Sequence, residues 1–286
     1  MNIKEVLSLT EEYLEKHGIE DPRLDAEVLL ADLLDMERIK LYVNFDYPLT
    51  GEELAGYRGR VRKRAEHVPV AYITGHKEFM SLDFYVDGNV LIPRPETELL
   101  VEEVINCCKE LELAEPNIID VGTGSGAIMV SLGSSLQEAR IVGIDSSASA
   151  LDVARENIKR HGLGDRLKVI KGDLLLPFIK RGKNNVDIVV SNPPYIASDE
   201  MDELPPEVLQ EPAEALDGGE QGLEYYAKLI SQAQKVLRPG GILCLEIGCN
   251  QGKEVRKMLK DGWKQVVIKQ DYSGLDRLVR AGRMGD

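Results

Sequence analysis

Residues 117–126 read Asn-Ile-Ile-Asp-Val-Gly-Thr-Gly-Ser-Gly, and this stretch decides the fold class. A short apolar segment, typical of a buried strand, runs directly into glycines at every second position. Glycines at a strand-to-helix turn let the backbone bend sharply and approach a ligand where side chains would clash. The pattern alone also suits an NAD-dependent enzyme, or a tight turn that binds nothing.

Downstream of this stretch, segments typical of strands alternate with segments of helical periodicity. The expected strands are 117–121, 139–145, 167–170, 186–190 and 241–246, and helices such as 148–161 and 222–237 lie between them. This order predicts a mostly parallel, doubly wound sheet with helices on both faces. Two closing strands, at 263–268 and 276–280, would complete a seven-stranded, Rossmann-like α/β sheet.

The N-terminal part of the chain has a different pattern. Residues 1–70 carry apolar side chains at helical spacing and predict a small helical domain. Aromatic and β-branched residues in 71–92, with turn residues such as Gly75, predict a β-hairpin linker. The remaining residues, 93–286, form the predicted cofactor-binding and catalytic domain.

Acidic residues follow two further strands of the predicted sheet. Asp145 ends the second strand, where a carboxylate can accept hydrogen bonds from both ribose hydroxyls. Asp173 follows the third strand and can take an adenine amino group, while Leu174 can pack on the ring. Asp120 would lie near the ammonium group of an amino-acid ligand. The predicted cofactor site comprises Asp120, Gly122, Thr123, Gly124, Ser125, Gly126, Asp145, Asp173, Leu174 and Asn192.

The fourth strand ends in the motif that carries the predicted chemistry, Ser191-Asn192-Pro193-Pro194-Tyr195. An amide nitrogen is a poor nucleophile because its lone pair is delocalised. The Asn192 side-chain oxygen and the Pro193 carbonyl could accept its two N–H groups, which favours charge building on nitrogen during methyl transfer. The prolines stiffen the loop, and Tyr195 could stack on the planar amide. A rigid turn without function is the plain alternative.

The two motifs resemble those of class I S-adenosylmethionine-dependent methyltransferases that modify planar nitrogens, adenine DNA methyltransferases among them. Other segments resemble the HemK-type protein-(glutamine-N5) methyltransferases in particular. They are Pro-Arg-Pro-Glu-Thr-Glu at 93–98, Glu211-Pro212 with Ala215, Leu216 and Gly218, Gly222-Leu223, and Asp-x-Ser-Gly-x-Asp-Arg-x-Val-Arg at 271–280. With the helical N-terminal domain and the hairpin, the resemblance covers nearly the whole chain.

The resemblance implies an enzyme of translation termination. Its substrates would be peptide-chain release factors, methylated at the glutamine of a Gly-Gly-Gln loop, with S-adenosylhomocysteine as the second product. Asn192 through Tyr195 would hold this glutamine, and Arg94, Glu96 and Thr97 would line the approach beside the donor. The alternatives left open are a glutamine methyltransferase of a large-subunit ribosomal protein, an adenine-N6 methyltransferase of nucleic acid, and a non-catalytic module that binds the nucleoside.

The charge and composition of the chain limit the classes of molecule that it is expected to bind. The net charge of −14 disfavours direct DNA binding, and a wholly acidic run of charges at 199–224 is either a solvated loop or a surface for basic residues of a protein substrate. A basic cluster at 58–64 is either a solvated helix face or a surface for acidic groups of a substrate or for RNA. No apolar run approaches the length of a membrane span, so we expect a cytoplasmic protein. The four histidines are scattered, so we expect no metal site, and without a coiled coil or a pairing strand we expect a monomer.

Overall fold

The computed structural model describes residues 1–182 and 185–285, and the chain divides into two compact units. The first unit comprises Met1–His76 together with Pro205–Gln210, and the second comprises Lys77–Leu204 with Glu211–Asp286. A short stretch of the acidic run therefore belongs with the N-terminal residues. Among the described residues no helix is both long and apolar enough to cross a membrane.

The first unit is helical, as predicted. Its helices are α1 (Ile3–Lys16), α2 (Pro22–Leu33), α3 (Arg38–Val43), α4 (Gly51–Ala65) and α5 (Val70–Thr74). The Thr50 hydroxyl accepts the Glu53 N–H at 3.2 Å and the Glu53 carboxylate accepts the Thr50 N–H at 2.7 Å, a capping box that begins α4. Apolar side chains of α1 and α2, with Tyr57 from α4, form a separate core.

The linker differs from the prediction at its start. Residues 71–74, expected to open the hairpin, belong to the short helix α5, which Pro69 precedes and which Gly75 ends in the left-handed conformation at φ 77°. The predicted hairpin follows as β1 (His76–Phe79) and β2 (Leu82–Tyr85), a sheet of two strands. The remaining linker residues, 86–92, contain no strand.

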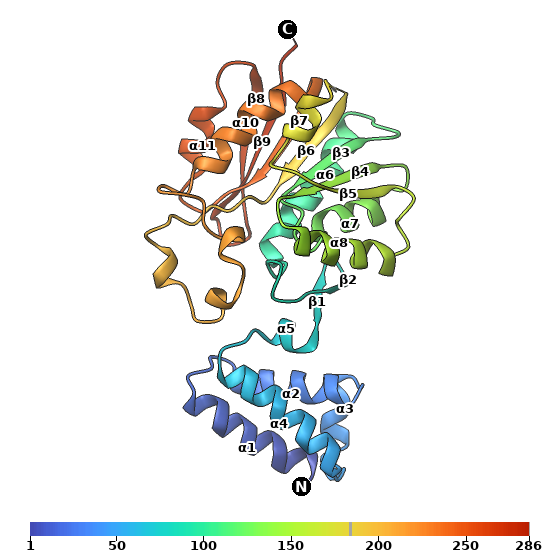
Figure 1. The fold of residues 1–286 in the computed structure, drawn as a ribbon, viewed down its shortest axis with the longest axis vertical. Helices are drawn as coiled ribbons and strands as arrows, with labels where there is room; N and C mark the ends of the chain where they lie inside the picture. The colour runs from blue at the N-terminus through green and yellow to red at the C-terminus, as the bar shows by residue number, and fades with distance from the viewer. Residues whose placement is uncertain (183–184, 286) are drawn as a thin grey trace. The chain divides into compact units, whose positions relative to one another are not determined.

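The second unit contains the predicted sheet (Figure 1). Its seven strands are β3 (Asn117–Val121), β4 (Arg140–Asp145), β5 (Leu167–Lys171), β6 (Val186–Ser191), β7 (Leu237–Glu246), β8 (Trp263–Gln270) and β9 (Asp276–Arg283). They lie in the order β5-β4-β3-β6-β7-β9-β8, and only β9 runs antiparallel to its two neighbours. The strand order changes direction at β3, so the carboxyl ends of β3, β4 and β6 border the crevice where such folds bind ligands.

Helices cover both faces of this sheet (Figure 1). Ile118 packs in one core with α6 (Glu98–Glu110) and α7 (Ala127–Ser135), and its neighbour Ile119 packs in the other core with α10 (Glu224–Val236). The remaining helices of this unit are α8 (Ala148–Arg160), α9 (Leu176–Lys180) and α11 (Gly252–Met258). Because both faces of the sheet are covered, successive residues of β3 from Ile118 to Val121 are all buried, as expected for the buried strand that the sequence indicated.

Candidate active site

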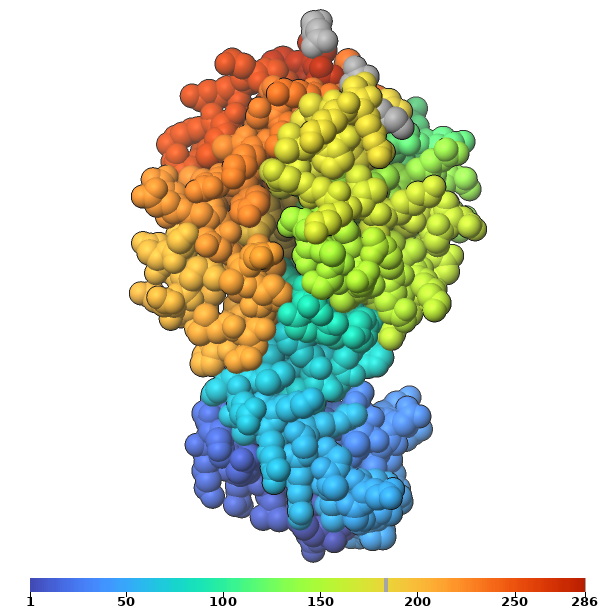
Figure 2. Space-filling model, in the orientation of Figure 1, coloured from blue at the N-terminus to red at the C-terminus, as the bar shows by residue number. Residues whose placement is uncertain are grey.

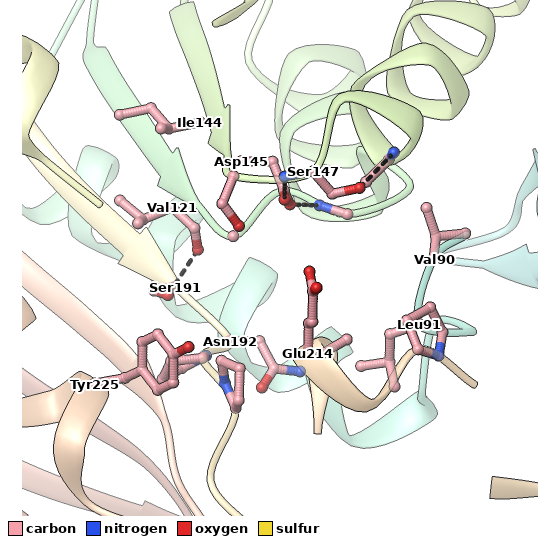
Figure 3. Close-up of a pocket in the computed structure, with 18 of the residues that line it drawn as sticks. Val90, Leu91, Val121, Ile144, Asp145, Ser147, Ser191, Asn192, Glu214 and Tyr225 are labelled. Atoms are coloured by element: carbon pink, nitrogen blue, oxygen red, sulfur yellow. Dashed lines mark hydrogen bonds between the residues drawn. The ribbon is translucent and has the colours of Figure 1, made fainter. Parts of the chain in front are cut away.

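A cavity of about 270 Å³ lies at the carboxyl edge of the sheet. The predicted residues that line it are Gly122, Gly124, Asp145, Asp173, Leu174, Asn192, Pro193 and Pro194. The close-up in Figure 3 shows Asp145 and Asn192 on opposite sides of this space. Figure 2 shows a hollow between the green and orange surfaces of the second unit, where this cavity opens. The structure therefore brings the nucleotide motif and the Asn-Pro-Pro-Tyr motif to one cavity.

The glycine-rich loop is held by backbone hydrogen bonds to the next strand. The N–H groups of Gly122 and Thr123 both donate to the Ile144 carbonyl, at 2.8 and 3.0 Å. Gly122 and Gly124 adopt φ values of +71° and +53°, a conformation that favours glycine. The loop thus presents backbone rather than side chains to the cavity, as the sequence predicted.

Two backbone N–H groups hold the carboxylate of Asp145 in place. Its Oδ2 accepts the Gly124 N–H at 2.9 Å and its Oδ1 accepts the Ser147 N–H at 2.9 Å. One carboxylate thereby joins the glycine loop to the start of α8, where Ser147 is the N-cap. Each carboxylate oxygen has a second acceptor position for a hydroxyl group of a ligand.

Asp120 has a different position from the other predicted cofactor residues. It is fully buried and is not among the residues that line the cavity. Its Oδ2 accepts the Thr123 hydroxyl at 2.6 Å, and its Oδ1 has no hydrogen-bond partner among the described residues. Burial raises the pKa of Asp120 to about 7. The predicted cofactor residues Thr123, Ser125 and Gly126 do not line the cavity either: Thr123 and Ser125 are buried, and Gly126 is the N-cap of α7.

The Asn-Pro-Pro-Tyr loop is anchored at its first residue. The Ser191 hydroxyl donates to the Val121 carbonyl at 2.7 Å, which joins the end of β6 to the end of β3. The Asn192 Nδ2 donates to the Thr97 hydroxyl at 3.2 Å. Thr97, predicted to line the approach, is buried and contacts the motif through Asn192 rather than lining the cavity itself.

A glutamine outside every predicted motif holds the other end of this loop. The Gln251 Nε2 donates to the Tyr195 carbonyl at 2.8 Å and to the Gly222 carbonyl at 3.1 Å. A Cβ atom at Gly218 would lie 2.8 Å from the Tyr195 Cα, so the chain passes too closely for a side chain there. The loop is therefore clamped between the segment after residue 217 and the start of α11.

Tyr195 itself lies away from the cavity lining. Its ring packs against the core on the α10 side of the sheet, and burial raises its pKa to about 12. The tyrosine that lines the cavity is Tyr225, from α10 (Figure 3). Stacking of Tyr195 on a substrate amide stays a prediction.

The segments 92–98 and 211–216 are joined by one buried carboxylate. Glu211 pairs with the Arg94 guanidinium and accepts the Ile92 N–H at 2.9 Å. Arg94 and Glu96 do not line the cavity. Lining residues that sequence reasoning missed include some just before residue 92, one between Pro212 and Ala215, and one from α10: Asn89, Val90, Leu91, Glu214 and Tyr225.

Several side chains of the acidic run at 199–224 already have partners within the chain. Glu207 pairs with Arg64 inside the first unit, and Glu211 pairs with Arg94. Asp217 accepts the Ser198 hydroxyl at 2.7 Å and the Gly219 N–H at 2.9 Å. The exposed acidic side chains that follow the Asn-Pro-Pro-Tyr loop most closely in sequence are Asp199, Glu200, Asp202 and Glu203. They are candidates for a surface that meets a basic partner.

Comparison with known families agrees with the two-part organisation. Residues 5–75 match the PrmC N-terminal domain model, and residues 114–277 match a methyltransferase domain model. Among solved structures, the hMettl16 catalytic domain in complex with a MAT2A 3'UTR hairpin is 18% identical, with 83% of each chain covered and a TM-score of 0.58. A methyltransferase from Pyrococcus furiosus is 18% identical, with 81% of this chain and 100% of that chain covered and a TM-score of 0.52. These likenesses show the methyltransferase fold.

Full-length relatives give a finer assignment. The release factor glutamine methyltransferase of Geobacter sulfurreducens is 42% identical over 285 residues, which cover 99% of this chain and 97% of that protein. The protein of the same name from Clostridium acetobutylicum is 40% identical and covers 100% of both chains. With a matching N-terminal domain and a methyltransferase fold whose two motifs meet at one cavity, this chain belongs to the family of release factor glutamine methyltransferases.

Proposed function

We propose that the protein transfers a methyl group from S-adenosylmethionine to the side-chain amide nitrogen of the glutamine in the Gly-Gly-Gln loop of a peptide-chain release factor. The observation that carries this proposal is the meeting of Asn192 and Pro193 with Asp145 and the glycine loop around one cavity. Its relatives are named for the same activity. We also propose that it acts in the cytoplasm, as a monomer and without a metal.

The residues that line the cavity suit S-adenosylmethionine and support its place as the cofactor. Gly122 and Gly124 present backbone at positive φ, and Asp145 offers a prefixed carboxylate for ribose hydroxyls. Asp173 and Leu174 line the same space and suit an adenine amino group and ring. When bound there, the cofactor supplies an activated methyl group on a sulfonium sulfur. Asp120 would act from beneath the loop, through Thr123.

Asn192 and Pro193 would orient the substrate amide. The Asn192 Nδ2 is held by Thr97, so its side-chain oxygen is the end available to a substrate N–H. The Pro193 carbonyl would accept the second N–H. Two fixed acceptors stabilise the positive charge that develops on the nitrogen as the new carbon–nitrogen bond forms. Positioning supplies most of the acceleration, and the product nitrogen releases its proton readily to water.

The remaining predicted residues would support the approach of the protein substrate. Pro194 stiffens the loop that carries Asn192, and Tyr195 would contact the substrate amide from the core side. Arg94 and Glu96 precede Thr97 on the segment that Glu211 fastens, so we expect them to position this segment. Asp202 and Glu203 would attract basic residues of the release factor.

The test uses radiolabelled S-adenosylmethionine with four substrates: a purified release factor, the same factor with its Gly-Gly-Gln glutamine changed, a large-subunit ribosomal protein, and duplex DNA. We expect label on the first alone, and loss of that label with the Asn192→Ala variant. Label on the ribosomal protein alone or on DNA would assign a different substrate. No label on any of the four would contradict the proposal.

A further inference from the structure

Glu246 is a buried carboxyl group beside the reacting loop that no motif pointed to. It is the last residue of β7, the strand that pairs with β6, and Leu245 stands opposite Ser191 in that pairing. Glu246 therefore reaches the sheet edge at the level where Asn192 leaves β6. Its side chain is only 3% exposed, and its Oε2 has no hydrogen-bond partner among the residues that the structure describes.

The neighbours of this carboxyl group are the residues that orient Asn192. The side chains of Thr97 and Asn192 both face it. Thr97 in turn accepts the Asn192 Nδ2 at 3.2 Å and is itself buried. Glu246, Thr97 and Asn192 thus form one polar cluster behind the cavity. Glu246 does not line the cavity, so it would act on the substrate only through Asn192.

A carboxylate at this place decides which way the Asn192 amide points. The two ends of an asparagine side chain have nearly the same shape but opposite hydrogen-bonding character. A hydroxyl group such as that of Thr97 can donate or accept, so it tolerates either orientation. An ionised carboxylate only accepts, so it favours the amide nitrogen and repels the amide oxygen. A protonated carboxyl group can donate and would tolerate the reversed amide.

We propose that Glu246 is a positioning residue for the methyl transfer, which keeps the Asn192 side-chain nitrogen turned inward and its oxygen turned towards the substrate glutamine. This inference rests on the proposed glutamine methylation. An unpartnered buried oxygen is costly to a folded protein, so its retention beside the reacting loop calls for a role of this kind.

The surroundings of Glu246 make its role dependent on pH. Burial raises its pKa to about 7, against the opposing influence of Thr97 and Arg277. The charged and titratable groups that face it are Arg277 from β9, Glu96 from the segment before α6, Tyr195 after β6, and Tyr226 from α10. Because Glu246 loses its proton as the pH rises through about 7, the productive orientation of Asn192 becomes favoured above that pH.

The experiment compares the full-length wild type with Glu246→Gln, which keeps the shape but can donate a hydrogen bond at any pH. The kcat for a release factor is measured at saturating S-adenosylmethionine, with the KM for the factor and the Kd for the cofactor. For a group of pKa about 7, we expect the wild-type kcat to rise about tenfold from about pH 6 to pH 8. Glu246→Gln should remain near the low-pH value throughout, with KM and Kd nearly unchanged.

Two further variants serve as controls for the role of the Glu246 carboxyl group. Glu246→Asp retains a carboxyl group and should retain a rise of kcat with pH, with its midpoint displaced. Asp120→Asn removes the other buried carboxyl of raised pKa, and it should alter the cofactor Kd while the rise in kcat persists. The inference is overturned if kcat of Glu246→Gln rises with pH as in the wild type, or if the variant loses the same factor in kcat at every pH. It is also overturned if kcat of Glu246→Asp does not rise with pH. Failure of the wild type to methylate the factor at any pH would instead refute the proposed function.

Discussion

Replacing Gly222 by alanine tests whether the position of the Asn-Pro-Pro-Tyr loop controls the reaction. Gly222 has a φ of +65°, and a Cβ atom there would lie 2.3 Å from the Tyr195 carbonyl oxygen and 2.8 Å from the Gln251 Nε2. Gly162 is a matched control, because its φ is +66° and a Cβ atom would meet nothing within 4 Å. The two substitutions impose the same backbone conformation on alanine, and only one of them pushes on the loop.

The expected magnitudes follow from these contacts. The left-handed conformation costs alanine about 1–2 kcal/mol of stability at either site. A relaxed carbon–oxygen contact is about 3.3 Å, so relief of the 2.3 Å contact displaces the Tyr195 carbonyl or Gly222 by about 1 Å. A displacement of about 1 Å in a positioning group can lower a rate by about a hundredfold. We therefore expect Gly222→Ala to lose about a hundredfold in kcat, and Gly162→Ala to lose little.

The assay measures kcat on a release factor, the Kd for S-adenosylmethionine and the free energy of unfolding for both variants. The cofactor Kd should stay near the wild-type value in each, because Gly222 lies outside the residues that line the cavity. Equal kcat values for the two variants would refute the reasoning, as would a loss of cofactor binding that accounts for the whole defect of Gly222→Ala.

Three further predictions concern Asp145, Glu246, and the exposed pair Asp202 and Glu203. Asp145→Asn should weaken S-adenosylmethionine binding about ten- to a hundredfold in calorimetry, since a hydrogen bond to a charged group contributes about 1.5–3 kcal/mol. The pKa of Glu246 rises on folding from 4.5 to about 7, so the folded protein binds the proton more tightly. The contribution of Glu246 to the free energy of unfolding is therefore fully present below about pH 4.5 and falls by about 3 kcal/mol as the pH rises towards 7. Urea unfolding of the wild type and of Glu246→Gln across this pH range would measure it. Lysine at Asp202 and Glu203 should raise the KM for a full-length release factor severalfold at low salt and leave kcat unchanged, and an unchanged KM would remove the acidic surface from the proposal. Glu207 is unsuitable for this charge reversal because its partner is Arg64.

Local patterns predicted the sheet and several of the residues that line the cavity at the ends of β3 and β4. Residues 117–126 contain the strand, the turn and the start of the helix in one stretch, and the structure shows each of them there. Asp145 was predicted from its place at a strand end, because parallel strands bring their carboxyl ends to one edge. The capping box at Thr50 and Glu53 likewise lies within one helical turn.

Elements without a strong local signal were predicted less well. The short helix α3 was not expected, because its six residues are too few to show a helical period. Most of the helix α5 lies where the sequence predicts the start of the hairpin, because Tyr72, Ile73 and Thr74 are residues that strands prefer. Pro69 and Gly75 bound it at either end, and those two residues were the available signal for a short helix.

The position of the Asn-Pro-Pro-Tyr loop depends on contacts that sequence spacing does not reveal. Gln251 holds the Tyr195 carbonyl from 56 residues away, and Glu211 holds Arg94 across 117 residues. A glutamine that follows a strand has no pattern of its own, so its role becomes visible only when the fold brings the two segments together. The same holds for Glu246, which the sequence shows only as an acidic residue at the end of an apolar strand.

The contrast between the two halves has a physical reason. A nucleotide cofactor is bound by one turn and by the ends of adjacent strands, so its residues lie close in sequence or recur at strand ends. Orienting a substrate amide requires a rigid loop, and a loop becomes rigid only when other segments hold it. Here Thr97 holds the first residue of the loop, Gln251 holds the last, and Gly222 allows the close approach. Substitutions in these supports should therefore lower kcat, whereas substitutions at Asp145 should weaken cofactor binding.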